Sequence, residues 1–228
     1  MGLRVAFDLD GTVADLSRAM HDVAKKKFRK LQDAEPEPPS DDGDGALPAD
    51  RPSLRDLGLS HDDLDRLWRH VLKQRNFWTS LPEMEDGLIA RIQQHADERR
   101  WDVIFITTRP LAAGQTTQVQ SQEWLVAKGF RHPSVYVVKG SRGKVAGALE
   151  LDAFVDDRRE NCLDIATESR ARAILVWHGS DEALGPGVAR HGVVVKASIT
   201  EALDELVQMD RDQRGGVVRS IKRLFTKQ

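Results

Sequence analysis

Two aspartates separated by one residue carry the strongest chemical signal in the sequence. Asp8 and Asp10 lie in the run Phe7-Asp-Leu-Asp-Gly-Thr12, which continues the apolar stretch that begins at Leu3. An apolar strand that ends in Asp and Gly turns at its carboxyl end, so both carboxylates can converge at that edge of a sheet. Two acids placed so close repel each other unless a cation or a shared proton relieves the repulsion. A hard divalent ion with oxygen ligands would do this, whereas the alternative interpretation is a turn without chemistry.

The elements that must position these aspartates form an alternating pattern. Short apolar runs bounded by Gly, Asp or Pro predict buried strands at 3–7, 103–106, 135–138, 153–155, 173–177 and 193–195. Helical spacing lies between most of them, at 87–98, 118–128, 143–149, 161–169 and 200–209. Strands and helices that alternate in this way predict an α/β fold with a parallel sheet wrapped by helices.

Residues 16–80 interrupt this alternation. Two helical patterns, at 16–31 and 62–73, follow the first strand where one crossover helix would be enough. Between them, residues 33–52 are rich in Pro, Asp and Gly and have little to bury, which predicts a flexible loop. We expect residues 1–15 and 81–210 to form the core, and residues 16–80 to form a small helical cap above the carboxyl ends of the strands, where open α/β sheets bind ligands.

Composition narrows the class of protein. The 228 residues, 40% of them hydrophobic, can build one sizeable core, and the net charge of −2 favours neither nucleic acid nor an anionic membrane. A single cysteine, Cys162, excludes an intramolecular disulfide, and the seven histidines show no spacing typical of a zinc site. We find no signal peptide and no apolar run near the ~20 residues of a membrane span. We therefore expect a soluble, cytoplasmic protein.

Residues 211–228 form a basic segment, with six Lys or Arg against one Asp and apolar side chains at roughly helical spacing. One interpretation is a terminal helix packed on the sheet, with its basic face in water. The other is a helix that binds a membrane surface or a partner, including a nucleic-acid end.

Three further polar clusters follow predicted strands. The first is Thr107-Thr-Arg-Pro110, which offers a hydroxyl to a phosphate oxygen. The second is Lys139-Gly-Ser-Arg-Gly-Lys144, and the third is Phe154-Val-Asp-Asp157, which ends in two acids. Together with Asp8-Leu-Asp-Gly-Thr12, and in this order, they resemble the four motifs of the haloacid dehalogenase superfamily, whose first motif is matched at every position.

This resemblance implies a fold and a mechanism. The fold is a Rossmann-like three-layer α/β core with a small helical cap after the first strand. Asp8 would attack phosphorus and form an aspartyl-phosphate, while Asp10 would protonate the leaving oxygen and then deprotonate the attacking water. The dehalogenases lack an acid at the position of Asp10, because a halide needs no proton, so the resemblance favours phosphoryl chemistry. Lys144, in preference to Lys139, would stabilise the negative charge of the nucleophile and the phosphate.

The resemblance also implies a magnesium site and a phosphate site. Mg²⁺ would be held by Asp8, the Asp10 main-chain carbonyl and the pair Asp156 and Asp157. Either acid of the pair can be the direct ligand: relatives with the same pair favour Asp157, whereas Asp157 as a helix N-cap would leave Asp156 on the metal. The phosphate-binding candidates are Thr107, Thr108 and Arg109, with Thr107 and Thr108 both open as the hydroxyl donor.

A finer resemblance is to the deoxyribonucleotidase-like branch of the superfamily. Residues 77–82, 123–125 and 155–158 carry it, and Arg109 departs from it. It implies a nucleoside monophosphate as substrate, with Phe77 and Trp78 either stacking on the base or packing the insert onto the sheet. The alternatives are a phosphatase for another small phosphorylated metabolite or for a nucleic-acid 3′ or 5′ phosphate end held by the basic tail, and a phosphate-binding protein without turnover.

Overall fold

The structure is a computed structural model, and it describes residues 2–27, 59–179 and 181–225. Its strands are β1 (Arg4–Asp8), β2 (Asp102–Thr107), β3 (Ser134–Val137), β4 (Ala153–Asp156), β5 (Arg172–Val176) and β6 (Val194–Lys196). Its helices are α1 (Leu16–Lys27), α2 (His61–Leu72), the 3₁₀ helix η3 (Phe77–Thr79), α3 (Leu88–Arg99), α4 (Thr117–Ala127), α5 (Arg142–Ala148), α6 (Arg159–Glu168), α7 (Asp181–Arg190) and α8 (Ile199–Phe225).

The strands form one six-stranded sheet in the order β3-β2-β1-β4-β5-β6. The strand pairs β1 with β4, β2 with β3, β4 with β5 and β5 with β6 are all parallel. Every predicted strand is present, and each of its ends lies within one residue of the predicted range. The predicted α/β fold with a Rossmann-like parallel sheet and a helical insert after the first strand is therefore confirmed.

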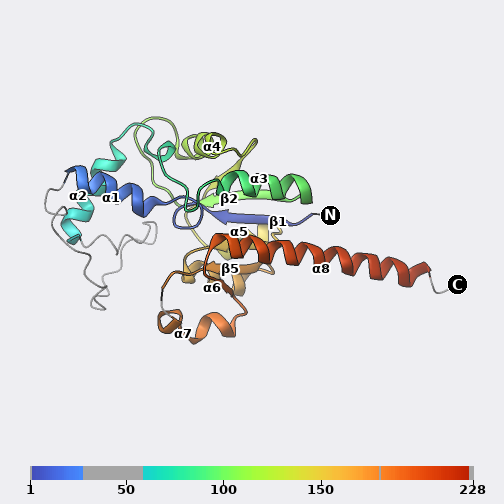
Figure 1. Cartoon of the computed structure of the whole chain (residues 1–228). Coiled ribbons are helices and arrows are strands. Elements are labelled where there is room, and N and C mark those ends of the chain that lie inside the picture. Colours follow the sequence, from blue (N-terminus) through green and yellow to red (C-terminus); the bar gives the residue numbers. More distant parts are fainter. Residues whose placement is uncertain (1, 28–58, 180, 226–228) are drawn as a thin grey trace. The chain divides into compact units, whose positions relative to one another are not determined.

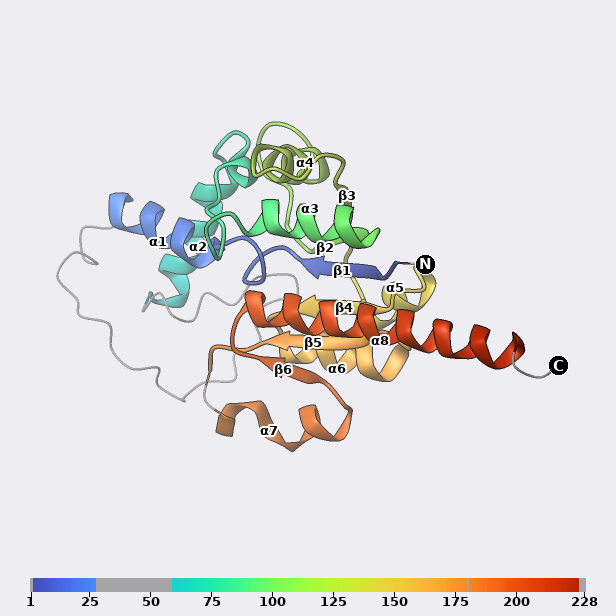
Figure 2. The ribbon, with the colours of Figure 1, turned by 45° about the vertical axis from the view of Figure 1, so that its right-hand side comes forward.

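The chain divides into two compact units, and the first comprises Met1–Phe7, Ile92–Val103 and Ser141–Gln228. Within it, helices α5 and α6 pack on each other, and α8 packs against β5 and β6 before it runs on toward the C-terminus (Figures 1 and 2). The buried carboxylate of Asp210 anchors α8, because it accepts hydrogen bonds from Arg99 at 3.3 Å and Arg214 at 3.0 Å. Helix α8 thus continues through most of the predicted basic tail as one helix.

The second unit comprises Asp8–Arg91 and Ile104–Gly140. Helices α1 and α2 of the insert lie side by side in it (Figures 1 and 2). Ser60 caps α2 by accepting a hydrogen bond from the Asp63 N–H, and the buried face of α2 carries Leu67, Trp68 and Val71. The insert therefore contains the two predicted helices, whereas the predicted loop at 33–52 lies outside the described residues.

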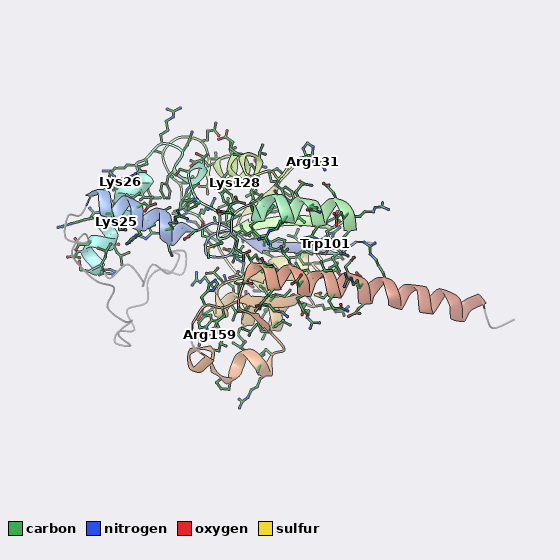
Figure 3. All side chains as sticks on the ribbon, viewed as in Figure 1. Lys25, Lys26, Trp101, Lys128, Arg131 and Arg159 are labelled. Carbon is green, nitrogen blue, oxygen red and sulfur yellow. The ribbon has the colours of Figure 1, made fainter. Side chains whose placement is uncertain are left out.

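Helix α7 was not expected from the sequence. Gly185 and Pro186 lie in its middle, a pair that indicates a turn. The structure accommodates both, because Gly185 adopts a left-handed φ of 67° and divides α7 into two helical pieces. Arg159, labelled in Figure 3, lies beside this kink, and its Nη1 is 3.8 Å from where a Cβ on Gly185 would be. No helix in the described part of the chain has the length and apolarity needed to cross a membrane.

Candidate active site

The first part of the site is the turn that follows β1. Asp8 is the last residue of β1, and Asp10 lies in the turn, with 7% and 9% of their surfaces exposed. Gly11 has a φ of 89°, a left-handed conformation that a side chain would strain, and its N–H donates to the Ala14 carbonyl at 2.9 Å. The Ala14 N–H in turn donates to the carbonyl of Leu9 at 2.7 Å. This closed turn holds both aspartates at the carboxyl end of β1, as the sequence predicts.

The second part is the carboxyl end of β2, where both threonine candidates lie. Thr107 is the last residue of the strand and is buried, and its hydroxyl accepts a hydrogen bond from the Arg109 N–H at 3.2 Å. This bond uses an acceptor position of the oxygen and leaves the hydroxyl proton as a donor. Thr108 is half-buried and follows the strand. Both threonines remain candidates for a phosphate contact, as in the sequence prediction.

The Arg109 side chain lies against Asp10. Its Nε donates to both Asp10 carboxylate oxygens, at 3.0 Å to Oδ1 and 2.8 Å to Oδ2, and Nη2 donates to Oδ1 at 2.7 Å. Its Nη1 donates to the Ser121 hydroxyl at 2.9 Å. The side chain is fully buried, so the structure directs Arg109 to the second aspartate, whereas the sequence analysis assigned it to phosphate. The physical reason is that a buried guanidinium requires a nearby anion, and Asp10 supplies it.

Phe77 and Trp78 belong to the packed interior. Their exposed fractions are 3% and 0%, and their rings meet edge to face with centroids 5.2 Å apart. The Trp78 main-chain N–H donates to Gln120 at 3.1 Å, and its indole N–H donates to the Pro110 carbonyl at 3.1 Å. Neither ring presents a face for stacking on a base, so the packing interpretation describes both residues and the substrate-pocket assignment does not.

In the other unit, the start of helix α5 carries Lys144. The Ser141 hydroxyl caps the helix by accepting the Lys144 N–H at 3.0 Å, and it donates to the Asp164 carboxylate at 2.9 Å. The same carboxylate accepts the Gly143 N–H at 2.9 Å. A side chain on Gly143 would meet the Asp164 carbonyl oxygen at 2.3 Å, so glycine is required for the contact between α5 and α6. The Lys144 side chain itself is exposed, with its backbone fixed by this network.

The pair Asp156 and Asp157 lies at the carboxyl end of β4, as Asp8 lies at the carboxyl end of β1. Asp156 is fully buried, and its carboxylate accepts hydrogen bonds from the Arg158 N–H at 2.8 Å and from the Asn161 amide at 2.9 Å and 3.1 Å. The Arg142 Nε lies 4.0 Å away. Burial, and then repulsion by Asp157, raises the pKa of Asp156 to about 7, against smaller opposing effects of Arg142 and the hydrogen bonds. A cation near this pair would relieve that cost.

The donor chemistry at this pair suits a hard divalent ion, because Mg²⁺ takes oxygen ligands and is usually bound by one or two carboxylates together with water. Within residues 2–27, 59–179 and 181–225, no group of three or more His, Cys, Asp or Glu side chains is arranged to hold a metal. The acids available are single or paired, with Asp8 at the end of β1 and Asp156 at the end of β4. In the register of these parallel strands, the preceding residues Phe7 and Val155 are partners.

The contacts that hold these groups in place were not predicted from the sequence; they come from Trp124, Ser121, Asn161, Ser141 and Asp164. Ser141 could have been found, since Ser before a helical pattern is a common N-cap. Asn161 and Asp164 face Asp156 and Ser141 from one helix, three residues apart, a spacing that marks one helical face but no chemistry. Ser121 lies within the helix predicted at 118–128, and Trp124 enters only as part of the finer resemblance at 123–125; neither position indicates its partner.

Comparison with known proteins gives a fold-level likeness. No family model matches the chain, and no curated protein matches it. A candidate beta-phosphoglucomutase from Thermotoga maritima matches 90% of this chain and 99% of its own, with a TM-score of 0.50 and 15% identity. A haloacid dehalogenase-like hydrolase from Streptococcus pneumoniae matches 89% and 97%, with a TM-score of 0.49 and 15% identity. An L-2-haloacid dehalogenase matches 92% and 100%, with a TM-score of 0.45 and 12% identity. The chain thus shares the fold of the Thermotoga maritima protein, a Rossmann-like α/β fold.

Proposed function

We propose that the chain is a magnesium-dependent phosphomonoester hydrolase of the haloacid dehalogenase superfamily. The observation that carries the proposal is the place of the motif residues on the sheet: Asp8 ends β1, Thr107 ends β2 and Asp156 ends β4. These three strands are neighbours, in the order β2-β1-β4. Open parallel sheets bind ligands at the carboxyl ends of their strands, and each of these three motif residues lies at such an end, which supports the assignment of the motifs.

Asp8 and Asp10 divide the chemistry between them. The Asp8 carboxylate attacks phosphorus, and the bond to the leaving oxygen breaks as Asp10 gives that oxygen a proton. Water then attacks the aspartyl-phosphate while Asp10 takes one of its protons, which releases phosphate and restores Asp8. The closed turn around Gly11 supports these roles, because it keeps the two acids on one short, rigid segment.

Lys144 and the two acids at the end of β4, Asp156 and Asp157, complete the proposed machinery. Lys144 offsets negative charge on the nucleophile and the phosphoryl group, and Thr107 or Thr108 donates to a phosphate oxygen. Mg²⁺, when bound, offsets charge on the transferring group, with Asp8, the Asp10 carbonyl and Asp156 or Asp157 as its ligands. Both oxygens of Asp156 already accept hydrogen bonds within the protein, which favours Asp157 as the direct ligand and Asp156 as its support.

The proposed substrate is a small phosphomonoester, with nucleoside monophosphates as the first class to test. The support for nucleotides is the similarity of residues 77–82 and 123–125 to the deoxyribonucleotidase-like branch. In the structure, the Arg109 guanidinium carbon lies 5.0 Å from the ring centroid of Trp78 and 5.8 Å from that of Trp124. These two rings serve internal packing, so recognition of a base requires other side chains.

Phosphate release from nucleoside monophosphates, sugar phosphates and p-nitrophenyl phosphate tests the proposal, with Mg²⁺ or with EDTA. We expect magnesium-dependent turnover that Asp8→Asn abolishes. Asp204→Asn, an exposed aspartate of α8, is the matched control and should keep full activity. Wild-type protein that hydrolyses no ester, or an Asp8→Asn variant as active as the wild type, would refute the proposed function.

A further inference from the structure

The contact between Arg109 and Asp10 is unequal at the two carboxylate oxygens. Oδ1 accepts hydrogen bonds from both Nε and Nη2, at 3.0 Å and 2.7 Å. Oδ2 accepts only from Nε, at 2.8 Å, and shares that proton with Oδ1. A carboxylate oxygen has about two lone-pair sites, so Oδ1 has both occupied while Oδ2 keeps acceptor capacity.

Arg109 is itself fixed by a closely packed set of neighbours. Its guanidinium lies over the rings of Trp78 and Trp124, and its Nη1 donates to the Ser121 hydroxyl. Each indole is anchored in turn: the Trp78 N–H donates to the Pro110 carbonyl at 3.1 Å, and the Trp124 N–H donates to the Leu81 carbonyl at 2.7 Å. The observed position of the arginine is thus supported by cation–π contact with two rings and by a hydrogen bond at its far end.

The stability of the fold does not by itself explain this set of contacts around Arg109 and Asp10. Replacing a buried ion pair by apolar residues is often neutral or stabilising, so stability alone gives no reason to keep Arg109 and Asp10 inside the protein. Rigid support of a reacting carboxylate does give a reason, because catalytic groups must be held within about 0.5 Å of their productive geometry.

We propose that Arg109 is a positioning residue that orients Asp10 so that Oδ2 is the oxygen that exchanges protons in the reaction. This rests on the proposed phosphohydrolase function. A guanidinium has donors only and stays protonated, so Arg109 neither gives nor takes the proton. Asp10 enters the reaction with a proton on Oδ2; in the first step this proton moves to the leaving oxygen as the phosphorus–oxygen bond breaks, which leaves the Asp10 carboxylate paired with Arg109. In the second step a proton of the attacking water moves to Oδ2.

The dependence on the leaving group tests this role, because an alkoxide needs a proton from Asp10 and p-nitrophenolate hardly does. We would measure kcat/KM, which reports the steps up to departure of the leaving group, for p-nitrophenyl phosphate and for an alkyl phosphate. Arg109→Lys, which keeps the charge but cannot bind both oxygens, should lose about 100-fold on the alkyl ester, the scale of general acid catalysis, and less than about 10-fold on the aryl ester. Guanidinium ion at low, non-denaturing concentration should restore part of the alkyl-ester activity of Arg109→Ala.

Three further variants make the result decisive. In an Asp10→Asn background, Arg109→Lys should cause no further loss, since its effect acts through Asp10. Arg99→Lys changes an arginine of a different, partly buried ion pair, with Asp210 at 3.3 Å, and should leave the activity on both esters unaffected. If Arg109 variants do not fold, Ser121→Ala, which removes only the Nη1 contact, should show the same selectivity with a smaller loss.

Equal losses on the two esters, or a loss that persists beside Asp10→Asn, would overturn the positioning role while the phosphohydrolase assignment stands. Wild-type protein without turnover on either ester would overturn the proposed function, and this inference with it.

Discussion

Arg109 and Asp10, 99 residues apart in the chain, form a buried ion pair in which three N–H···O contacts of 2.7 to 3.0 Å join one guanidinium to one carboxylate. The Arg109 side chain is 0% exposed and that of Asp10 is 6% exposed. Each charge therefore depends on the other, because water cannot replace the missing partner. This pair connects the turn after β1 to the end of β2, so it couples the geometry of the candidate acid to the packing of the interior.

The same pair should dominate the response of this region to substitution. Arg109→Ala should lower the free energy of unfolding by about 3–5 kcal/mol, because it leaves the Asp10 carboxylate buried without its cation. The double change Arg109→Met with Asp10→Asn should recover most of this loss, since no unpaired charge remains. Urea unfolding of the wild type and the two variants measures both effects. A double variant no more stable than Arg109→Ala would show that the cost comes from lost packing instead.

The glycines of α5 offer a matched pair of substitutions. Gly143→Ala places a Cβ 2.3 Å from the Asp164 carbonyl oxygen, so α5 must move away from α6, and we expect a loss of about 1–3 kcal/mol in unfolding free energy. Because Lys144 is the next residue, activity should fall as well. Gly147→Ala on the same helix meets only ordinary contacts, at 3.6 Å or more, and should stabilise the protein by about 0.5–1 kcal/mol. Thermal unfolding compares the two, and equal effects would rule out the steric explanation for Gly143.

The sequence predicted the strands well because each is an apolar run that ends at a polar or turn-forming residue. Its motifs also placed Asp8, Thr107 and Asp156 at strand ends, where the structure has them. Side-chain partners were not predictable in this way. Nothing near Arg109 in the chain indicates its anion, because the contact with Asp10 arises only when distant segments fold together. Helix α7 was missed because Gly-Pro in a short segment indicates a turn. The structure accommodates Gly185 and Pro186 within the helix by a kink at Gly185.

Asp156 should make the stability of the metal-free protein depend on pH. Its pKa is raised from 3.8 to about 7 in the fold, so the folded protein holds the proton more tightly than the unfolded chain does. The resulting stabilisation is present at low pH, begins to be lost above 3.8 and is gone above about 7. In EDTA, the unfolding free energy of the wild type should therefore fall relative to that of Asp156→Asn as the pH rises through this interval. Parallel pH profiles of the two proteins would contradict the raised pKa.

Magnesium should reverse this loss if Asp156 and Asp157, at the end of β4, belong to its site. Asp157 raises the pKa of Asp156 by repulsion, so ionised Asp156 above about pH 7 is destabilised by its neighbour, and a bound cation offsets that repulsion. Mg²⁺ at 100 times its dissociation constant should add about 2.7 kcal/mol to the unfolding free energy, read as a rise in the melting temperature. Asp157→Asn should reduce this rise strongly, while Asp204→Asn on α8 should keep it and so exclude a general effect of salt. An unchanged rise in Asp157→Asn would remove this acid from the proposed ligands and transfer the role to Asp156.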